Sequence, residues 1–182
     1  MTVMRRIVTA LVFALVLMPV GAVTLLRLEL DEMIEKSTAI VRGQVAGSWA
    51  RFHGPVIYTH YRIRVLERWK GAEATEEDVV VPGGVADGLR QVFPGAPKLA
   101  DGTEYVLFLW RGSSGLTNIM GLTQGLFDVH RDIAGGVFAA RMATSESMLD
   151  AGGRLVKDEP LRLRFEELRG RIRAALARGS QK

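Results

Sequence analysis

Histidines have the most direct potential for catalysis in this chain, and there are three of them, His53, His60 and His130. Three imidazoles that leave one coordination position open could hold zinc and activate a water molecule for hydrolysis. Their spacing fits no metal-binding motif, because the sequence has no HExxH, no His-x-His and no glutamate at helical distance from a histidine. We therefore expect no metal and no other cofactor, and we expect the histidines to lie at the solvent-exposed surface.

Asp128 and His130 form a second candidate pair. They stand two positions apart on a strand-like segment, so their side chains should point the same way. A carboxylate that orients an imidazole is the beginning of general-base chemistry. No serine is tied to the pair by a motif, since the serines between Gly112 and Gly115 lack the spacing of a nucleophile elbow. We favour a surface pair and a protein that is not an enzyme.

The clearest chemical pattern is a stripe of polar side chains on one predicted strand, residues 56–69. Apolar residues alternate there with Tyr58, His60, Arg62, Arg64 and Arg68. Such period-two alternation predicts a half-buried antiparallel strand. Aromatic and arginine side chains suit stacking and contacts with anions. Two interpretations stay open: a solvated face whose arginines pair with acidic groups, which we favour, and a surface that binds a glycan, an anionic polymer or a partner protein.

The elements that must position these side chains are mostly short strands. We predict a helix over residues 28–37 and strands over residues 38–48, 56–69, 78–81, 103–110, 116–120, 125–130 and 137–141. Gly43 and Gly47 indicate a bulge in the first strand, and the apolar run 103–110 predicts a central strand buried on both faces. Residues 82–101 form a long loop rich in glycine and proline. This pattern predicts a mainly β fold, a small closed or partly closed antiparallel barrel.

A different periodicity marks the C-terminal region. Its apolar residues stand three or four positions apart and are Leu161, Phe165, Leu168, Ile172 and Leu176. This spacing predicts a basic amphipathic helix over residues 160–177. Such a helix could pack against the barrel or lie on an anionic membrane; we favour packing.

The N-terminus has the layout of a secretory signal. Arg5 and Arg6 precede a nearly continuous apolar run, and a breaking Pro19 stands shortly before small residues that end at Ala22. We predict cleavage after Ala22; the alternative is an uncleaved anchor over residues 7–26, which is long enough to cross a bilayer. Either way, we expect the domain outside the cytoplasm, in the periplasm or outside the cell.

Composition and charge exclude several classes of protein. The chain has 182 residues and no cysteine, which excludes disulfides, a thiolate nucleophile and thiolate metal sites. The net charge of +4 comes from the ends, because residues 154–182 hold nine Lys or Arg against four Asp or Glu and residues 1–22 hold two arginines and no acid. The body between them is acidic overall, which argues against a nucleic-acid partner.

Three motifs carry a resemblance to a known family. They are Thr38–Val45 (TAIVRGQV), Val65–Gly71 (VLERWKG) and Gly102–Leu109 (GTEYVLFL). Together they resemble the netrin-like, tissue-inhibitor-of-metalloproteinase-like OB-fold barrels, as in uncharacterised exported bacterial proteins of that style, over residues 37–110. The resemblance implies an OB-like barrel. The inhibitors of that family use an N-terminal cysteine and disulfides, which this chain lacks, so no functional residue is carried over.

We therefore expect three segments: a signal peptide (1–22), an OB-like barrel domain (23–153) and a basic C-terminal helix on or beside it (154–182). The function that we favour is an exported, non-enzymatic module that binds a protein, glycan or anionic polymer of the cell envelope through the second strand and the 82–101 loop. The alternatives are a metal-assisted hydrolase that uses histidines and Asp128, and a structural envelope protein tethered by its N-terminus. The N-terminal segment or the C-terminal helix could contact a membrane.

Overall fold

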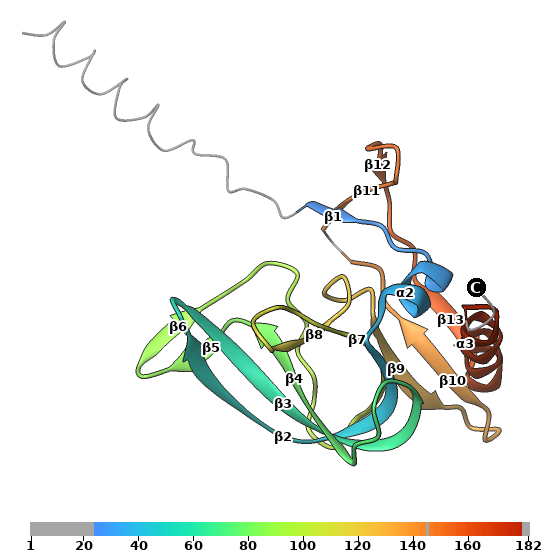
Figure 1. Ribbon diagram of the computed structural model, residues 1–182, viewed down its shortest axis with the longest axis horizontal. Helices are drawn as coiled ribbons and strands as arrows, with labels where there is room; N and C mark the ends of the chain where they lie inside the picture. The colour runs from blue at the N-terminus through green and yellow to red at the C-terminus, as the bar shows by residue number, and fades with distance from the viewer. Residues whose placement is uncertain (1–23, 145, 180–182) are drawn as a thin grey trace, which may run out of the picture.

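The computed structural model describes residues 24–144 and 146–179, so the predicted signal peptide lies outside the described residues. Strands dominate this part of the chain (Figure 1). They are β1 (Thr24–Leu26), β2 (Ala39–His53), β3 (Val56–Lys70), β4 (Glu76–Pro82), β5 (Gly84–Ala86), β6 (Leu89–Gln91), β7 (Glu104–Arg111), β8 (Thr117–Ile119), β9 (Leu126–Arg131), β10 (Val137–Arg141), β11 (Ser147–Leu149), β12 (Leu155–Val156) and β13 (Leu161–Arg164). The helices are α2 (Leu30–Lys36) and α3 (Phe165–Gly179). The mainly β class, with a short helix near the N-terminus and a helix near the C-terminus, is confirmed.

Five strands follow one another in a closed circuit of pairings. The largest sheet has the order β13-β10-β9-β7-β2-β3-β4-β8, and β8 also pairs with β7. The β4–β8 pairing is parallel and the β7–β8 pairing is antiparallel. The pairings therefore run from β7 through β2, β3, β4 and β8 back to β7. Strands β9, β10 and β13 continue the sheet from β7 as a branch.

The circuit strands share a first hydrophobic core. Its buried members are Ala39, Val41, Val45, Tyr61, Ile63, Val79, Val81, Leu99, Tyr105, Leu107, Leu109 and Ile119. The Tyr105 hydroxyl accepts a hydrogen bond from the backbone N–H of Ala100 at 3.0 Å, which satisfies this polar atom at the edge of the core.

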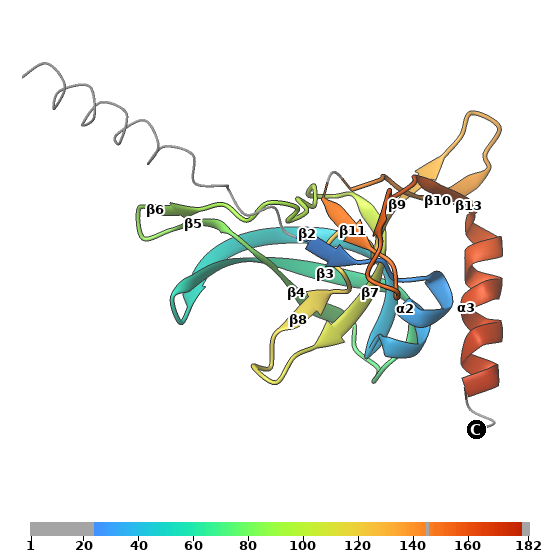
Figure 2. The same cartoon turned by 90° about the horizontal axis from the view of Figure 1, so that it is seen from above.

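A second core joins the branch of the sheet to both helices. Its buried members are Leu30, Met33, Ile34, Ile40, Val106, Phe108, Phe127, Ala139, Phe165, Leu168 and Ile172. Figure 2 shows α3 beside α2 at one end of the molecule. The apolar stripe of α3 is thus packed within the protein, and no helix in the described part of the chain is long and apolar enough to cross a membrane. We call this end, with α2, α3 and β9–β10–β13, the base.

Strand β7 lies between β2 and β9 and is buried on both faces. Tyr105, Leu107 and Leu109 belong to the first core. The intervening Val106 and Phe108 belong to the second. This confirms the prediction of a central strand over residues 103–110.

The predicted start of the C-terminal helix at residue 160 is wrong. Leu161–Arg164 form β13, which pairs antiparallel with β10, and α3 begins at Phe165. Leu161 and Leu163 alternate with arginines, and both pack against the second core. As a strand, this segment packs both leucines against the second core and pairs with the backbone N–H and C=O groups at the edge of β10. The strand therefore takes the place of the first turn of the expected helix.

The expected 82–101 loop contains a hairpin, β5–β6. Its turn is Asp87-Gly88, and both residues have positive φ, 50° and 75°. Two consecutive left-handed residues are what a tight hairpin turn needs, and Asp-Gly is a preferred pair for it. Strands β1, β11 and β12 form a separate small sheet that the sequence did not predict.

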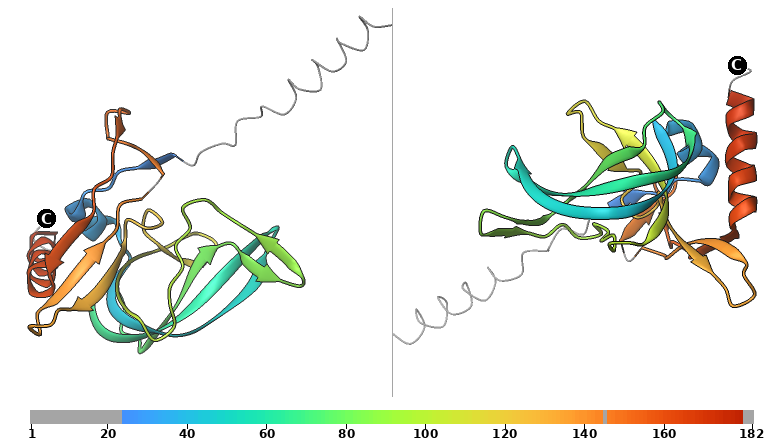
Figure 3. Two further views of the ribbon diagram at one scale, coloured as in Figure 1. Left: turned by 180° about the vertical axis from the view of Figure 1, so that it is seen from behind. Right: turned by 90° about the horizontal axis from the view of Figure 1, so that it is seen from below.

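Strands β2 and β3 form one long curved ribbon. They pair from Ile40–Lys70 to His53–Val56. Figures 1 and 3 show that the far end of this ribbon, with β5 and β6 beside it, lies opposite α3. We call this end, residues 47–62 together with the β5–β6 hairpin, the tip.

Candidate functional site

A buried histidine organises the outer face of the tip. His60 has no solvent-exposed surface. Its Nδ1 lies 2.8 Å from Asp78 Oδ1, and its Nε2 accepts a hydrogen bond from Arg51 Nε at 3.0 Å. Because the guanidinium can only donate, Nε2 must accept and Nδ1–H must donate to the carboxylate. With both ring nitrogens engaged, His60 has no free lone pair for proton abstraction and instead holds Asp78 and Arg51 in place.

His60 also supports an exposed tryptophan. Trp49 is its cross-strand partner, and the two rings stack with centroids 5.1 Å apart and planes 14° from parallel. The tryptophan remains 39% exposed. The guanidinium of Arg62 lies 5.5 Å from the centre of the indole ring, and its pairing with Glu76 is loose at 3.9 Å. The result is an aromatic surface that His60 supports on its inner side and that an exposed positive charge flanks.

The structure separates the residues of the predicted stripe. Arg62 and Arg64 are exposed, and Arg64 donates a hydrogen bond to the side chain of Gln44. Tyr58 is half-buried, with its ring edge-to-face against that of His53 at 6.3 Å. The side chain of Arg68 is 5% exposed and forms an ion pair with Glu77 at 2.7 Å. The prediction that the stripe forms one exposed face is therefore wrong for His60 and Arg68; binding by the stripe stays a prediction.

A β-bulge in β3 explains why the side chain of Arg68 points to the opposite face of the strand from those of Arg62 and Arg64. Gly43 lies opposite Val65, whereas Arg42, the residue before it on β2, lies opposite Glu67. Leu66 is thus an extra residue of β3, and the alternation of faces reverses beyond it. The bulge predicted in the first strand is confirmed by the register shift between Val45 and Gly47. At Gly43 the extra residue belongs to β3, and glycine is required there because a Cβ would lie 2.8 Å from a backbone oxygen of that strand.

The β5–β6 hairpin is attached to the tip by specific hydrogen bonds. The side chain of Gln91 accepts one from the Ile57 N–H at 2.6 Å and donates one to the Pro55 carbonyl at 2.9 Å. Thr59 Oγ1 donates to the Gly83 carbonyl at 2.7 Å. Although the hairpin is held in place, four apolar side chains in it or directly after it face solvent, namely Val85, Leu89, Val92 and Phe93.

The other catalytic candidates lie apart from this cluster. His53 ends β2, and Asp128 and His130 stand two positions apart on β9, as predicted. Within the described ranges, the side chains of Asp128 and His130 take part in no hydrogen bond or ion pair, and no group of three or more His, Asp or Glu could hold a metal ion. The structure therefore does not bring the three histidines together.

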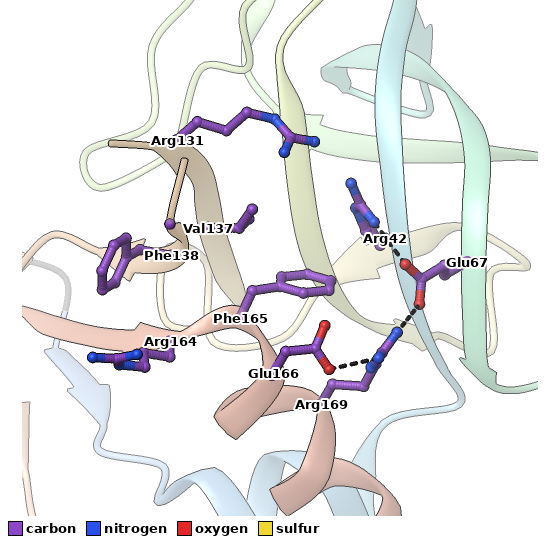
Figure 4. A pocket seen from close by; sticks show the side chains of 10 residues that line it. Arg42, Glu67, Arg131, Val137, Phe138, Arg164, Phe165, Glu166 and Arg169 are labelled. Atoms are coloured by element: carbon purple, nitrogen blue, oxygen red, sulfur yellow. Dashed lines mark hydrogen bonds and ion pairs between the residues drawn. The ribbon is translucent and has the colours of Figure 1, made fainter. Parts of the chain in front are cut away.

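A pocket of about 430 Å³ opens at the base, at the junction of β9, β10 and β13 with the start of α3. Its lining residues are Arg42, Glu67, Arg131, Gly136, Val137, Phe138, Arg164, Phe165, Glu166 and Arg169. Figure 4 shows the guanidinium groups of Arg131 and Arg42 on the same side of the pocket, with the ring of Phe165 below them. The Arg42 guanidinium lies 4.8 Å from the centre of that ring.

A network of ion pairs holds the wall of this pocket. Glu67 accepts from Arg42 Nη1 at 2.6 Å and contacts Arg169 at 3.4 Å. Arg42 also donates through Nε to Glu104, and this hydrogen bond is the main reason that the pKa of Arg42 is raised. Burial alone would raise the pKa of Glu67, but the hydrogen bonds and charges of Arg42 and Arg169 outweigh burial, so this pKa is lowered. Arg42 and Glu67 therefore stay ionised at neutral pH.

Sequence reasoning missed Trp49, Arg51 and Asp78 at the tip, and Arg42 and Arg131 at the base. These residues are brought together by the register of the strands, and the bulges shift that register. Their spacing along the chain therefore does not indicate that they lie close together. The Asp-Gly turn was the available signal for the hairpin. Comparison with protein-family models, with curated proteins and with solved structures found no match for this chain.

Proposed function

We propose that this chain is an exported binding module, built on an OB-like barrel, that holds an acidic partner protein on its tip. The connectivity of the circuit supports the barrel. Taken in chain order, its strands are β2, β3, β4, β7 and β8; the third and fifth pair in parallel, and the fourth returns to the first. OB-folds are five-stranded Greek-key barrels that bind ligands on the face of their second and third strands and on the loop between the first and second. His60, Arg62 and Asp78 lie on the corresponding strands.

The observation that carries the proposal is the half-exposed Trp49 stacked on a fully buried His60. Binding hot spots are enriched in tryptophan and arginine, and they work best when neighbouring side chains hold them rigid. Here the carboxylate of Asp78 and the guanidinium of Arg51 fix the supporting imidazole. The tip therefore presents a large aromatic surface that loses little conformational entropy when a partner binds.

The surroundings of Trp49 indicate the chemistry of the partner. Arg62 lies beside Trp49, and Arg64 on β3 and Arg90 on the hairpin are further exposed arginines, so we expect this end to favour acidic groups. The four exposed apolar side chains in the hairpin and directly after it favour a partner with apolar surface of its own. A protein supplies both, whereas an anionic polysaccharide supplies the charge and has little to place on aliphatic side chains.

A pull-down from envelope extract with matched variants tests this function. The test variant is Trp49→Ala with Arg62→Gln. The control is Trp110→Ala with Arg111→Gln, which removes a tryptophan of similar exposure and an exposed arginine from the end of β7. We expect the native chain and the control to retain the same acidic protein and the test variant to lose it. Equal retention by all three would refute the tip as the binding surface.

The pull-down and mass spectrometry of the protein distinguish the alternative functions. A captured polysaccharide, identified by its resistance to protease and its sugar composition, would replace the protein partner by an anionic glycan. Mass spectrometry of the mature N-terminus decides between a chain cleaved after Ala22 and a tethered one. A hydrolase has no supporting observation of its own, because both ring nitrogens of His60 are hydrogen-bonded and His53 and His130 lie on other strands.

A further inference from the structure

We propose that the pocket at the base binds a small organic anion, a molecule with an apolar body and one carboxylate or phosphate group. The pocket lies at the opposite end of the molecule from the tip, so this inference is independent of the proposed partner protein. Its volume of about 430 Å³ falls in the range typical of small-molecule sites.

The charges of the pocket favour an anion. Four arginines line it against two glutamates. Both carboxylates are already engaged: Glu67 binds Arg42 and Arg169 through separate oxygens, and Glu166 binds Arg169 at 2.5 Å. The guanidinium of Arg131 takes part in no ion pair or hydrogen bond among the residues that the structure describes. The pocket thus keeps an unneutralised cation and leaves no free carboxylate to attract a cationic ligand.

The geometry of the arginines defines where the anionic group would lie. Figure 4 shows the Arg131 guanidinium directed toward Arg42, whereas that of Arg164 is directed away from it. Arg42 is held by Glu67 and Glu104, so it cannot turn away from its neighbour. A carboxylate or phosphate between Arg131 and Arg42 would accept charge-assisted hydrogen bonds from the planar guanidinium of Arg131 and relieve the repulsion between the two cations.

The remaining wall of the pocket is apolar, so we expect the body of the ligand to be apolar as well. Val137 from β10 and Phe165 at the start of α3 line it, together with Phe138. Figure 4 shows Val137 and the ring of Phe165 between Arg131 and the ion pair of Glu166 with Arg169. Phe165 is already covered, being only 4% exposed, whereas Val137 is half-buried. A free inorganic anion would leave Val137 uncovered. An aromatic or aliphatic group attached to the anion would cover it and gain the free energy of burial.

The test is a titration of the isotope-labelled protein, followed by the shifts of its backbone amides in NMR spectra. The probes are benzoate and phenyl phosphate, with benzyl alcohol as an uncharged molecule of similar size. We expect both anions, or one of them, to shift the amides of Val137, Phe165 and Glu166 saturably. Benzyl alcohol should bind at least roughly tenfold more weakly, because it cannot accept a charge-assisted hydrogen bond. The stronger anion tells whether the site takes carboxylates or phosphates.

Three variants locate the anionic group. Arg131→Gln should weaken binding of the anions roughly tenfold, and Arg131→Lys should weaken it less, since lysine keeps the charge and loses the planar pair of donors. Arg164→Gln removes the same charge from the rim and should leave affinity within about twofold. Arg131 is exposed, so we expect these variants to fold, which circular dichroism checks.

Four outcomes would overturn the inference. They are equal binding of benzyl alcohol and the anions, equal losses in the Arg131 and Arg164 variants, saturable shifts confined to residues outside the pocket, and no saturable shift below about 10 mM of either anion.

Discussion

The base buries its large apolar side chains, whereas the tip leaves several of its own exposed to solvent. At the base, Phe165, Leu168 and Ile172 leave solvent almost completely because α3 covers the branch of the sheet. At the tip, Val85 and Leu89 are each 61% exposed on a hairpin that hydrogen bonds hold in place. An apolar residue is therefore buried only where the fold supplies a second layer. Within the described chain no such layer covers Val85 and Leu89, which marks the outer side of the hairpin as a surface that a partner could cover.

One arginine from each end shows that burial decides whether the side chain has a paired acid. Arg141 at the base is 12% exposed and makes two hydrogen bonds to the carboxylate of Asp158 at 2.8 and 2.9 Å. Arg62 at the tip is 56% exposed and approaches Glu76 only to 3.9 Å. Buried arginines need a paired acid because an unpaired buried charge is costly. Exposed arginines need none, so they remain available to a ligand.

The largest expected effect contrasts two phenylalanines. Phe165→Ala at the base should lower the free energy of unfolding by about 3–5 kcal/mol, because it leaves a cavity in the second core. Phe93→Ala beside the hairpin should lower it by less than about 1.5 kcal/mol, since that ring already contacts solvent. Urea unfolding followed by circular dichroism measures both, and equal losses would break the contrast between base and tip.

The next effect contrasts two arginines of β3. Arg68→Ala should cost about 3 kcal/mol of unfolding free energy, because Glu77 would lose its partner in a position that is only 20% exposed. Arg62→Ala should change it by less than about 0.5 kcal/mol, as is usual for exposed ion pairs. Chemical denaturation of both variants checks the bulge directly. Similar values would mean that Arg68 lies on the exposed face with Arg62.

A smaller effect depends on pH and belongs to the base. Burial alone would raise the pKa of Asp158, but hydrogen bonds from Arg141 and the Thr144 N–H outweigh it and lower this pKa. The folded pKa lies below the unfolded value of about 3.9, so the stabilisation is present above that pH and is lost as the pH falls through the folded value.

Asp158→Asn should therefore cost about 2 kcal/mol of unfolding free energy at pH 7. The difference from the native chain should shrink at pH 3 and below. Glu76→Gln at the tip is the control, and it should change stability by less than about 0.5 kcal/mol at either pH. Urea unfolding at several pH values measures both variants. A difference for Asp158→Asn that stays constant down to pH 2 would contradict the assignment.

The smallest effect on stability sharpens the description of the tip. Val85→Ser with Val92→Ser should change the free energy of unfolding by less than about 1 kcal/mol, since both side chains are exposed. The same double variant should elute earlier from a hydrophobic-interaction column. Unchanged elution would show that the hairpin does not present these side chains to solvent.

Much of the fold could be predicted from single residues and local patterns. Alternation located β3, the apolar run located β7, and Gly43 and Gly47 stand at two of the register shifts between β2 and β3. The candidate site could not be predicted in the same way. The register that pairs Trp49 with His60, and the bulge that turns Arg68 inward, follow from contacts between strands that a one-residue shift would change completely. The C-terminal helix was predicted too long because Leu161 fits the helix stripe with Phe165 as well as the strand in which it alternates with Leu163.

Strand β7 determines how the protein should unfold. Because its alternate residues complete two cores, neither core can open without exposing the other face of the same strand. We therefore expect the circuit and the helical base to melt in one cooperative transition, with the amide protons of Val106, Leu107 and Phe108 among the slowest to exchange with solvent. The tip, which contributes little to either core, should exchange through local fluctuations long before that transition.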